Sequence, residues 1–296
     1  MSGRMSGALS GPVSGAEAGG AADRGRGLLR RTLRRSLRWA VRWPVLAVCV
    51  LAWEAATRRA GNPYFPPPSA ILPRMRQLWL GGPAGRLWLS EDAVHGLLPG
   101  IARMLAGFAI AAAAGVVLGV AVGRTRVVRE AIEPVLRFFR AIPTPMLVPV
   151  FLVLFRIGTQ MELATILFGA VWPVLLNTAD GVAGVDPRHL ETAAAFRFGP
   201  ATLLWRVVLP SALPRILAGL RLAMALSLIL MVFAEMVGST GGVGYELVNA
   251  QSQFDLVGMW AVIVLLGVLG YLLNAVLVLA GRLLLGRRET PGEAEA

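Results

Sequence analysis

Long apolar segments separated by short polar loops are the feature that most constrains this chain. A helix needs about 20 mostly apolar residues to cross a bilayer, and most of these segments are long enough. The predicted spans are residues 39–57, 97–122, 132–155, 161–179, 215–237 and 256–280. The sequence therefore predicts an all-α, polytopic membrane protein with six transmembrane helices in a domain covering residues 43–285.

The first of these segments is the weakest. Its uninterrupted apolar run is short, and Glu54 and Arg58 follow at once. A cleaved signal peptide is the competing interpretation, because arginine pairs precede the run and small residues follow it. Retention of this segment is favoured. The orientation predicted for the next span agrees with a membrane anchor before it, and cleavage would remove that anchor.

The two ends of the chain are polar. Residues 1–27 are rich in Gly, Ser and Ala without hydrophobic periodicity, which predicts a disordered cytoplasmic tail. Residues 28–42 alternate arginine with leucine and tryptophan, the pattern of a basic amphipathic helix on a membrane surface. These arginines lead directly into an apolar segment, so lipid is favoured over nucleic acid as their partner. Residues 286–296 form a second cytoplasmic tail.

Composition excludes several kinds of protein. Of the 296 residues, 56% are hydrophobic, more than a soluble domain of this length needs for one core. All 29 basic residues are arginine, so the chain has no lysine for a nucleotide-binding P-loop or a Schiff base. Cys49 is the single cysteine, which excludes an internal disulfide.

The distribution of arginine predicts the orientation. Arginines gather before the first span and at residues 124–129, 188–206 and 282–288, whereas residues 238–255 contain none. Short cytoplasmic loops carry the excess of positive charge, so both termini are predicted to be cytoplasmic. The loop at residues 58–96 is predicted to lie outside although it contains several arginines, but longer loops translocate with less regard to charge.

Two patterns inside the spans concern packing and flexibility. Small residues recur every fourth position of the second span, which predicts a face for close helix packing: Gly107, Ala111, Gly115, Gly119 and Gly123. Prolines break the third span at positions 134, 143, 145 and 149. Such breaks survive in lipid where protein or water satisfies the freed carbonyls, so the segment either lines a pathway or is kinked for packing.

The stretch ETAAAFRFGPATLLWRVVLP, at residues 191–210, interrupts the series of apolar segments. Asp186 is a predicted N-cap with Pro187 in the first helical position. Gly199 and Pro200 are predicted to end this first short helix, and a second short helix runs to Pro210. This mixture of apolar and charged residues predicts that the stretch binds in a groove on another protein.

This stretch resembles the EAA loop of permease subunits of ATP-binding-cassette (ABC) importers. Glu191, Ala193, Leu209 and Pro210 fall at matching positions, with Thr192 in place of an alanine. The segments YFPPPSAILPRM, VWPVLLNTADGV and GGVGYELVNAQSQFD extend the resemblance to the nitrate, sulfonate, taurine and bicarbonate branch. The family's glycine, six residues after the glutamate, is replaced here by Arg197. The nearest glycine comes two residues later, which predicts a longer first helix and a late break.

The resemblance implies a type I ABC importer permease fold without a catalytic or metal site. Two copies form the translocation path, cytosolic ATPase subunits bind ATP and Mg²⁺, and an extracytoplasmic binding protein delivers the solute. The permease itself needs no cofactor. The helix around Glu191–Phe198 becomes the cytoplasmic coupling helix, with Glu191 making an ionic or capping contact and Ala193, Phe196 and Phe198 packing into a groove. The implied docking residues are Arg188, Glu191, Ala193, Ala194, Phe196, Arg197, Phe198, Gly199, Leu209 and Pro210.

A few polar residues lie within or beside the predicted spans. Pro145, Asn177 and Glu235 are candidates for the translocation path, and for Glu235 a gate is favoured over a structural hydrogen bond. Arg103, Arg137 and Arg140 are assigned to topology rather than to an anion clamp. His95 and His189 stand alone, without neighbours at ligand spacing. The GSTGGVG loop is predicted to be a turn facing the binding protein.

Two other function classes compete with the permease hypothesis. An ion-coupled secondary transporter would show paired broken helices in repeated halves and clustered midplane carboxylates. A membrane enzyme would need convergent polar groups at one membrane face. Neither pattern is present in the sequence. A permease of another ABC importer branch remains an alternative, and the sequence does not name the solute.

Overall fold

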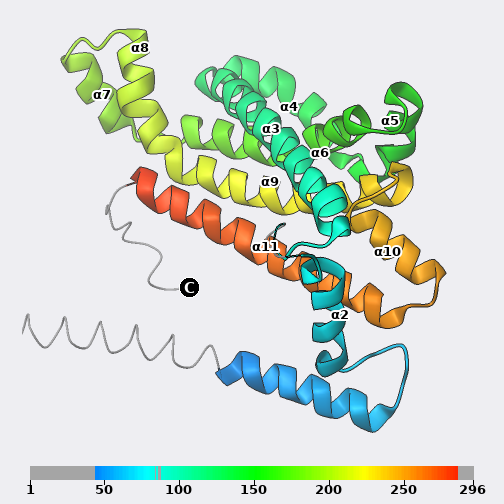
Figure 1. Ribbon diagram of the computed structural model, residues 1–296. Helices are drawn as coiled ribbons and strands as arrows, with labels where there is room; N and C mark the ends of the chain where they lie inside the picture. Colours follow the sequence, from blue (N-terminus) through cyan, green and yellow to red (C-terminus); the bar gives the residue numbers. More distant parts are fainter. Residues whose placement is uncertain (1–43, 84, 86–87, 286–296) are drawn as a thin grey trace, which may run out of the picture. The chain divides into compact units, whose positions relative to one another are not determined.

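The computed structural model describes residues 44–83, 85 and 88–285, and the regular structure in these ranges is helical (Figure 1). The predicted tails at 1–27 and 286–296 and the surface helix at 28–42 lie outside the described residues. The chain divides into two units between Asn62 and Pro63. In the first unit, the described residues form one helix at residues 44–60.

The second unit contains the remaining elements. The long helices are α3 (Leu98–Arg124), α6 (Thr159–Ala183), α9 (Leu209–Gly238) and α11 (Leu256–Leu285). The shorter helices are α2 (Pro68–Leu80), α4 (Arg126–Ala141), α5 (Val148–Phe155), α7 (Pro187–Ala195), α8 (Pro200–Leu203) and α10 (Val243–Ser252). Single π-helical turns, η2 (Ala93–Leu97) and η4 (Leu204–Val208), precede α3 and α9, and a 3-10 turn, η3 (Thr144–Leu147), precedes α5.

Four helical segments in the described residues are long and apolar enough to cross a membrane: 93–124, 159–183, 200–238 and 256–283. They confirm four of the predicted spans. The helix at residues 44–60 covers most of the predicted first span and lies at the short end of the usual range of about 17–25 residues. Because part of that span lies outside the described residues, it stays a prediction.

The predicted third span, 132–155, is not one continuous helix. α4 and α5 are separated by η3 and bent by 76°, so together they form either a broken span or a re-entrant loop. Ile142 and Pro143 have extended backbone, as expected for residues that precede or carry a proline ring. The helix is therefore broken at Ile142 and Pro143 rather than bent slightly, and Pro149 lies in the first turn of α5, where its missing N–H is tolerated.

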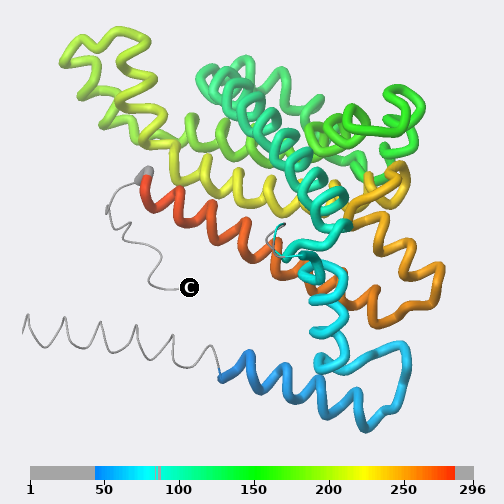
Figure 2. Tube along the Cα trace, viewed as in Figure 1, coloured from blue at the N-terminus to red at the C-terminus, as the bar shows by residue number. Residues whose placement is uncertain are grey.

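The small-residue face of α3 packs directly against α6, as predicted (Figure 2). A Cβ atom added at Gly119 would lie 2.6 Å from the carbonyl oxygen of Leu175, and one at Gly115 would lie 2.6 Å from Cβ of Val174. Side chains larger than hydrogen would push the two backbones apart.

A neighbouring face of α6 packs against α9 in the same way. Gly219 of α9 faces the carbonyl oxygen of Pro173 and the side chain of Asn177, and an added Cβ would lie 2.8 Å from each. α6 therefore packs closely against both α3 and α9, which also contact each other. Buried side chains such as Ala111, Ala170 and Ala223 continue this core.

The segment before α11 is fixed by polar contacts. Asp255 accepts a hydrogen bond from the backbone N–H of Gly258 at 2.8 Å, which caps α11, and it pairs with Arg74 of α2 at 2.6 Å. Burial raises the pKa of Asp255, but the Gly258 N–H and the Arg74 guanidinium outweigh it and hold the pKa below its ordinary value.

Candidate functional site

A short helical hairpin, α7–α8, projects from the bundle beyond the ends of α6 and α9 (Figure 1). Pro187 occupies the first position of α7, and the Asp186 carboxylate accepts a hydrogen bond from the N–H of Arg188 at 2.9 Å. The predicted N-cap and first helical residue are therefore confirmed. Because Pro187 has no N–H to leave unpaired, the start of α7 is well defined.

The end of α7 differs from the prediction. The helix stops at Ala195, and Arg197 adopts the left-handed conformation with φ +52°. The N–H of Arg197 donates to the carbonyl of Ala194 at 2.9 Å, and the N–H of Phe198 donates to that of Ala193 at 3.0 Å. These are the two hydrogen bonds of a Schellman motif, which usually has glycine at the left-handed position.

The prediction of a late break at Gly199 is therefore wrong. Gly199 is extended, with φ −66°, and serves as the N-cap of α8. Arg197 replaces the glycine expected by family resemblance and still adopts its conformation. The hydrogen bonds that end the helix outweigh the preference of a residue with a Cβ for negative φ, at a cost of about 1–2 kcal/mol.

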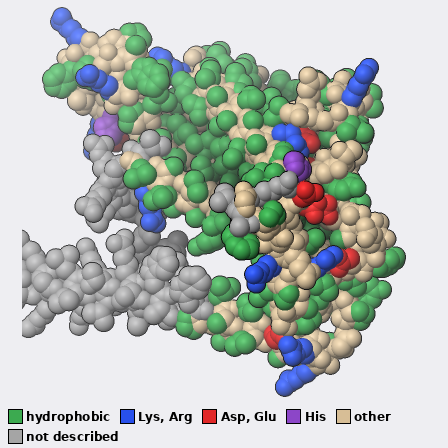
Figure 3. Space-filling view, viewed as in Figure 1, with side chains coloured by type: hydrophobic (Ala, Val, Ile, Leu, Met, Phe, Trp, Pro, Cys, Tyr) green, Lys and Arg blue, Asp and Glu red, His purple; other side chains and the backbone are tan. Residues whose placement is uncertain are grey.

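The turn brings two aromatic side chains together at the tip of the hairpin. The rings of Phe196 and Phe198 lie 6.2 Å apart, and Phe196 is 72% exposed. Trp205 is also exposed, and the face in view in Figure 3 shows hydrophobic side chains beside arginines on the hairpin. Exposed aromatic side chains rimmed by charge are typical of protein interaction sites.

Most of the predicted docking residues lie on this exposed surface. Arg188, Glu191, Ala194, Phe196, Arg197, Phe198, Gly199 and Pro210 are exposed, and Leu209 is half-buried. Ala193 is the exception, because it is only 3% exposed and packs within the chain itself. Its side chain does not present a surface to a partner, contrary to its predicted role.

The second arm of the hairpin continues into a long helix without a break. α8, η4 and α9 together form one helical segment from residue 200 to residue 238. The π-helical turn η4 lies directly before Pro210, which cannot donate a backbone hydrogen bond. The exposed hairpin is thus connected to the core of the bundle by continuous helix.

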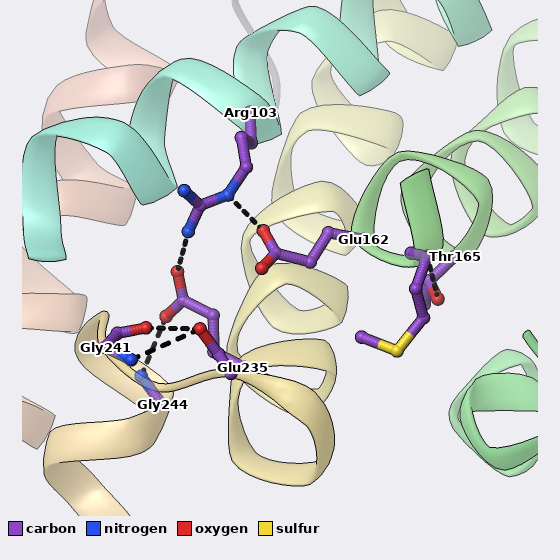
Figure 4. Close-up of polar contacts among 8 residues, drawn as sticks. Arg103, Glu162, Thr165, Glu235, Gly241 and Gly244 are labelled. Atoms are coloured by element: carbon purple, nitrogen blue, oxygen red, sulfur yellow. Dashed lines mark hydrogen bonds and ion pairs between the residues drawn. The ribbon is translucent and has the colours of Figure 1, made fainter. Parts of the chain in front are cut away.

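A buried polar cluster lies at the other end of α9 (Figure 4). Arg103 of α3 donates through Nε to Glu162 of α6, and its Nη2 lies 3.5 Å from Oε1 of Glu235 of α9. The side chains of both glutamates are almost fully buried, and that of Arg103 is mostly buried. One guanidinium therefore holds the ends of three helices together.

The GSTGGVG loop encloses the Glu235 carboxylate. The N–H of Gly244, in the first turn of α10, donates to Oε2 of Glu235 at 2.9 Å. A Cβ added at Gly242 would lie 2.4–2.6 Å from the carboxyl group, and one at Gly100 would lie 2.3 Å from Oε1. The glycines thus permit close approach to a carboxylate of the same chain, which a helix N-terminus also favours.

Local sequence patterns missed Arg103 and Glu162 as members of this cluster. Glu162 lies 59 residues from its arginine partner and Glu235 lies on a third helix, so no local spacing connects them. The available signal was that each is a charged residue within a predicted span.

The other predicted pathway residues have structural contacts. Asn177 donates to the carbonyl of Pro173 at 2.8 Å and faces Gly219 of α9. Pro145 is half-buried in the turn between α4 and α5. Within the described ranges, no group of three His, Cys, Asp or Glu side chains has the arrangement of a metal site.

Comparison with protein families gives the decisive match. Residues 97–289 match the model of the binding-protein-dependent transport system inner membrane component. The chain belongs to this family. It is therefore a multi-pass membrane protein and a permease subunit of an ABC transport system.

Several curated permeases are similar over most of this chain. The putative aliphatic sulfonates transport permease protein SsuC of Bacillus subtilis (strain 168) is 31% identical over 69% of this chain and 74% of its own length. The bicarbonate transport system permease protein CmpB of Synechococcus elongatus is 33% identical over 68% and 73%. The taurine transport system permease protein TauC of Escherichia coli (strain K12) is 29% identical over 82% and 86%.

A solved structure shares the fold of the permease. A chain of the inward-facing MetNI methionine ABC transporter matches 67% of this permease and all of its own length, with TM-score 0.60 and 21% identity. The predicted type I importer fold is thereby confirmed. Membership of this family implies two kinds of partner, an ATPase subunit and a solute-binding protein.

The buried cluster generates a stability prediction for the permease. Arg103→Leu leaves two buried carboxylates without their cation, so it lowers the free energy of unfolding by about 3–5 kcal/mol. Arg126→Leu is the matched control, because Arg126 pairs with Glu130 on the exposed surface of α4 and contributes about 0–1 kcal/mol. Unfolding of the purified permease in detergent measures both. Equal losses in the two variants would contradict the structural role of Arg103.

The left-handed arginine generates a second prediction. Arg197→Gly removes the cost of positive φ and stabilises the end of α7 by about 1 kcal/mol. Hydrogen exchange at the amides of residues 197 and 198 slows roughly fivefold, as follows from that energy. Arg188→Gly, within the first turn of α7, has the opposite effect because glycine is unfavourable in a helix. Faster exchange in Arg197→Gly would exclude the Schellman geometry.

Proposed function

We propose that this permease imports a small solute of the sulfonate, taurine, nitrate or bicarbonate type. A binding protein delivers the solute from outside the cell, and separate ATPase subunits drive its passage. The similar permeases serve transport of aliphatic sulfonates, bicarbonate and taurine, which supports this solute class, and nitrate is added by the resemblance to the branch. The path is formed with a second copy of the chain, as the resemblance to this branch implies.

The observation that carries this proposal is the exposed hairpin joined to a spanning helix. Phe196 and Phe198 form an aromatic pair at its tip, and Glu191 lies exposed on α7. We assign these residues to a groove on the ATPase subunit. A displacement of the ATPase acts first on α7, and the continuous segment 200–238 carries it through the membrane to the outer end of α9.

The orientation follows the arginine distribution. The hairpin carries Arg188, Arg197 and Arg206, whereas residues 238–255 carry no arginine. We therefore place the chain in the cell membrane, with the hairpin and both termini on the cytoplasmic side. ATP and Mg²⁺ bind to the partner subunit, and this chain holds no cofactor.

The buried cluster then lies at the outer end of the path. Separation of α3 from α6 and α9 would pull Arg103 away from Glu162 and Glu235, which is costly for buried carboxylates. We assign Glu235 to an outer closure that such separation opens. Pro145 and Asn177 are also assigned to the path, because Pro145 lies at a helix break and Asn177 at the interface with α9.

Capture of the ATPase tests the docking assignment. Phe196→Ala weakens capture by the detergent-purified permease at least about tenfold, since aromatic anchors carry much of an interface's energy. Glu191→Arg reverses a charge at the same surface and also weakens it. Phe254→Ala is the control, because Phe254 is 80% exposed between α10 and α11, at the opposite end of α9. Unchanged capture by Phe196→Ala and Glu191→Arg would show that the hairpin is not the docking surface.

A further inference from the structure

α4 is an amphipathic helix with an unusual orientation. At 100° per residue, its charged side chains fall on one face and its apolar side chains on the other. The charged face carries Arg126, Arg129, Glu130, Glu133, Arg137 and Arg140. In a soluble protein the apolar face of such a helix would pack against the core.

Part of the apolar face of α4 points away from the rest of the unit. Val127 is 74% exposed and Phe138 is 65% exposed, and no residue of α4 is buried. Phe139, near the end of the helix, stacks on Trp172 of α6 with ring centroids 6.0 Å apart and so fixes the orientation of α4. One edge of the charged face, at Arg129, Glu133, Arg137 and Arg140, is therefore turned toward α3 and α6, an arrangement that a membrane protein tolerates where the charges line water.

This edge of α4, together with Leu136, lines an open cavity of about 430 Å³ between α3, α4 and α6. Arg129, Arg137 and Arg140 contribute three positive charges, and Glu133 and Asp180 contribute two negative ones. Arg137 pairs with Glu133, one turn before it on α4. Among the described residues, Arg129 and Arg140 have no ion pair within 4.0 Å, so their guanidinium groups are available to a ligand.

The cavity lies at the hairpin end of the bundle. It includes Val122 near the end of α3 and Asp180 near the end of α6, and α7 begins a few residues after α6. This is the end from which a solute leaves if the hairpin binds the ATPase. Its volume falls within the range of about 300–1,000 Å³ for small-molecule sites.

We propose that Arg129, Arg137 and Arg140 form an oxyanion-binding site at the exit of the translocation path. Guanidinium groups bind sulfonate, carboxylate and phosphate oxygens in a two-pronged geometry, which suits a small solute that carries such a group. The site rests on the proposed import function and extends it, because it assigns solute binding to the permease as well as to the delivery protein. It also replaces topological charge as the account of Arg137 and Arg140.

Binding of radiolabelled sulfate to the full-length permease tests this site. The permease is reconstituted alone in phosphatidylcholine nanodiscs, and binding is measured by scintillation proximity. Arg140→Gln and Arg129→Gln each weaken saturable binding at least about tenfold, since each removes a charge-assisted hydrogen bond. Arg140→Lys retains the charge without the planar fork and binds with intermediate affinity.

Arg126→Gln is the matched control. It removes the same charge from the same helix, but Arg126 is paired with Glu130 and does not line the cavity. Binding by this variant stays within about twofold of the wild type. Equal weakening in Arg126→Gln and Arg140→Gln, with equal thermal stability, would overturn the site in favour of general positive charge. Absence of saturable sulfate binding in the wild type would overturn it as well.

A second set of nanodiscs distinguishes a free solute from a lipid headgroup. If phosphatidylglycerol displaces sulfate from the wild type, the oxyanion site exists and a lipid phosphate occupies it. If sulfate binding is unchanged by phosphatidylglycerol, the site selects the free anion. These measurements need no ATPase, so failure of the docking proposal and failure of this site are separable.

Discussion

The bundle is built on close contacts of α6 with α3 and with α9. Gly115 and Gly119 allow α3 to touch the backbone of α6, and Gly219 does the same for α9. Helices in lipid associate through such packing, because lipid tails provide little hydrophobic drive between them. The three helices therefore form a layer whose two ends carry the polar groups of the permease.

Different physical effects act at the two ends of this layer. At one end, Arg103 joins the carboxylates of Glu162 and Glu235 in a buried site, where loss of a partner is costly. At the other end, the hairpin exposes aromatic side chains, which we assign to docking of the ATPase. α9 connects the two ends, so a change of its position is felt at both. The polar cavity beside α4 lies at the hairpin end, where the permease releases its solute under this account.

Periodic patterns predicted much of this fold from the sequence. The apolar lengths located four spans, the four-residue spacing of small residues located the face of α3, and the Asp186–Pro187 pair located the start of α7. Arg197 was missed because residue preference favours glycine at positive φ, whereas hydrogen bonds to Ala193 and Ala194 decide the turn. The cluster around Arg103 and the cavity beside α4 depend on contacts between distant helices, which local spacing does not contain.

We expect α8 and α9 to move as one helix when the ATPase closes. Electron-spin distance measurement tests it directly, with spin labels on cysteines at Ala201 and Leu222 in a Cys49→Ser background and labelled copies diluted in unlabelled ones. With a non-hydrolysable ATP analogue, the account predicts an unchanged distance between these labels. It also predicts a shift of about 1–2 Å or more between Leu222 and a label at Val117 of α3. A changed Ala201–Leu222 distance, which would mean bending at η4, would contradict the account.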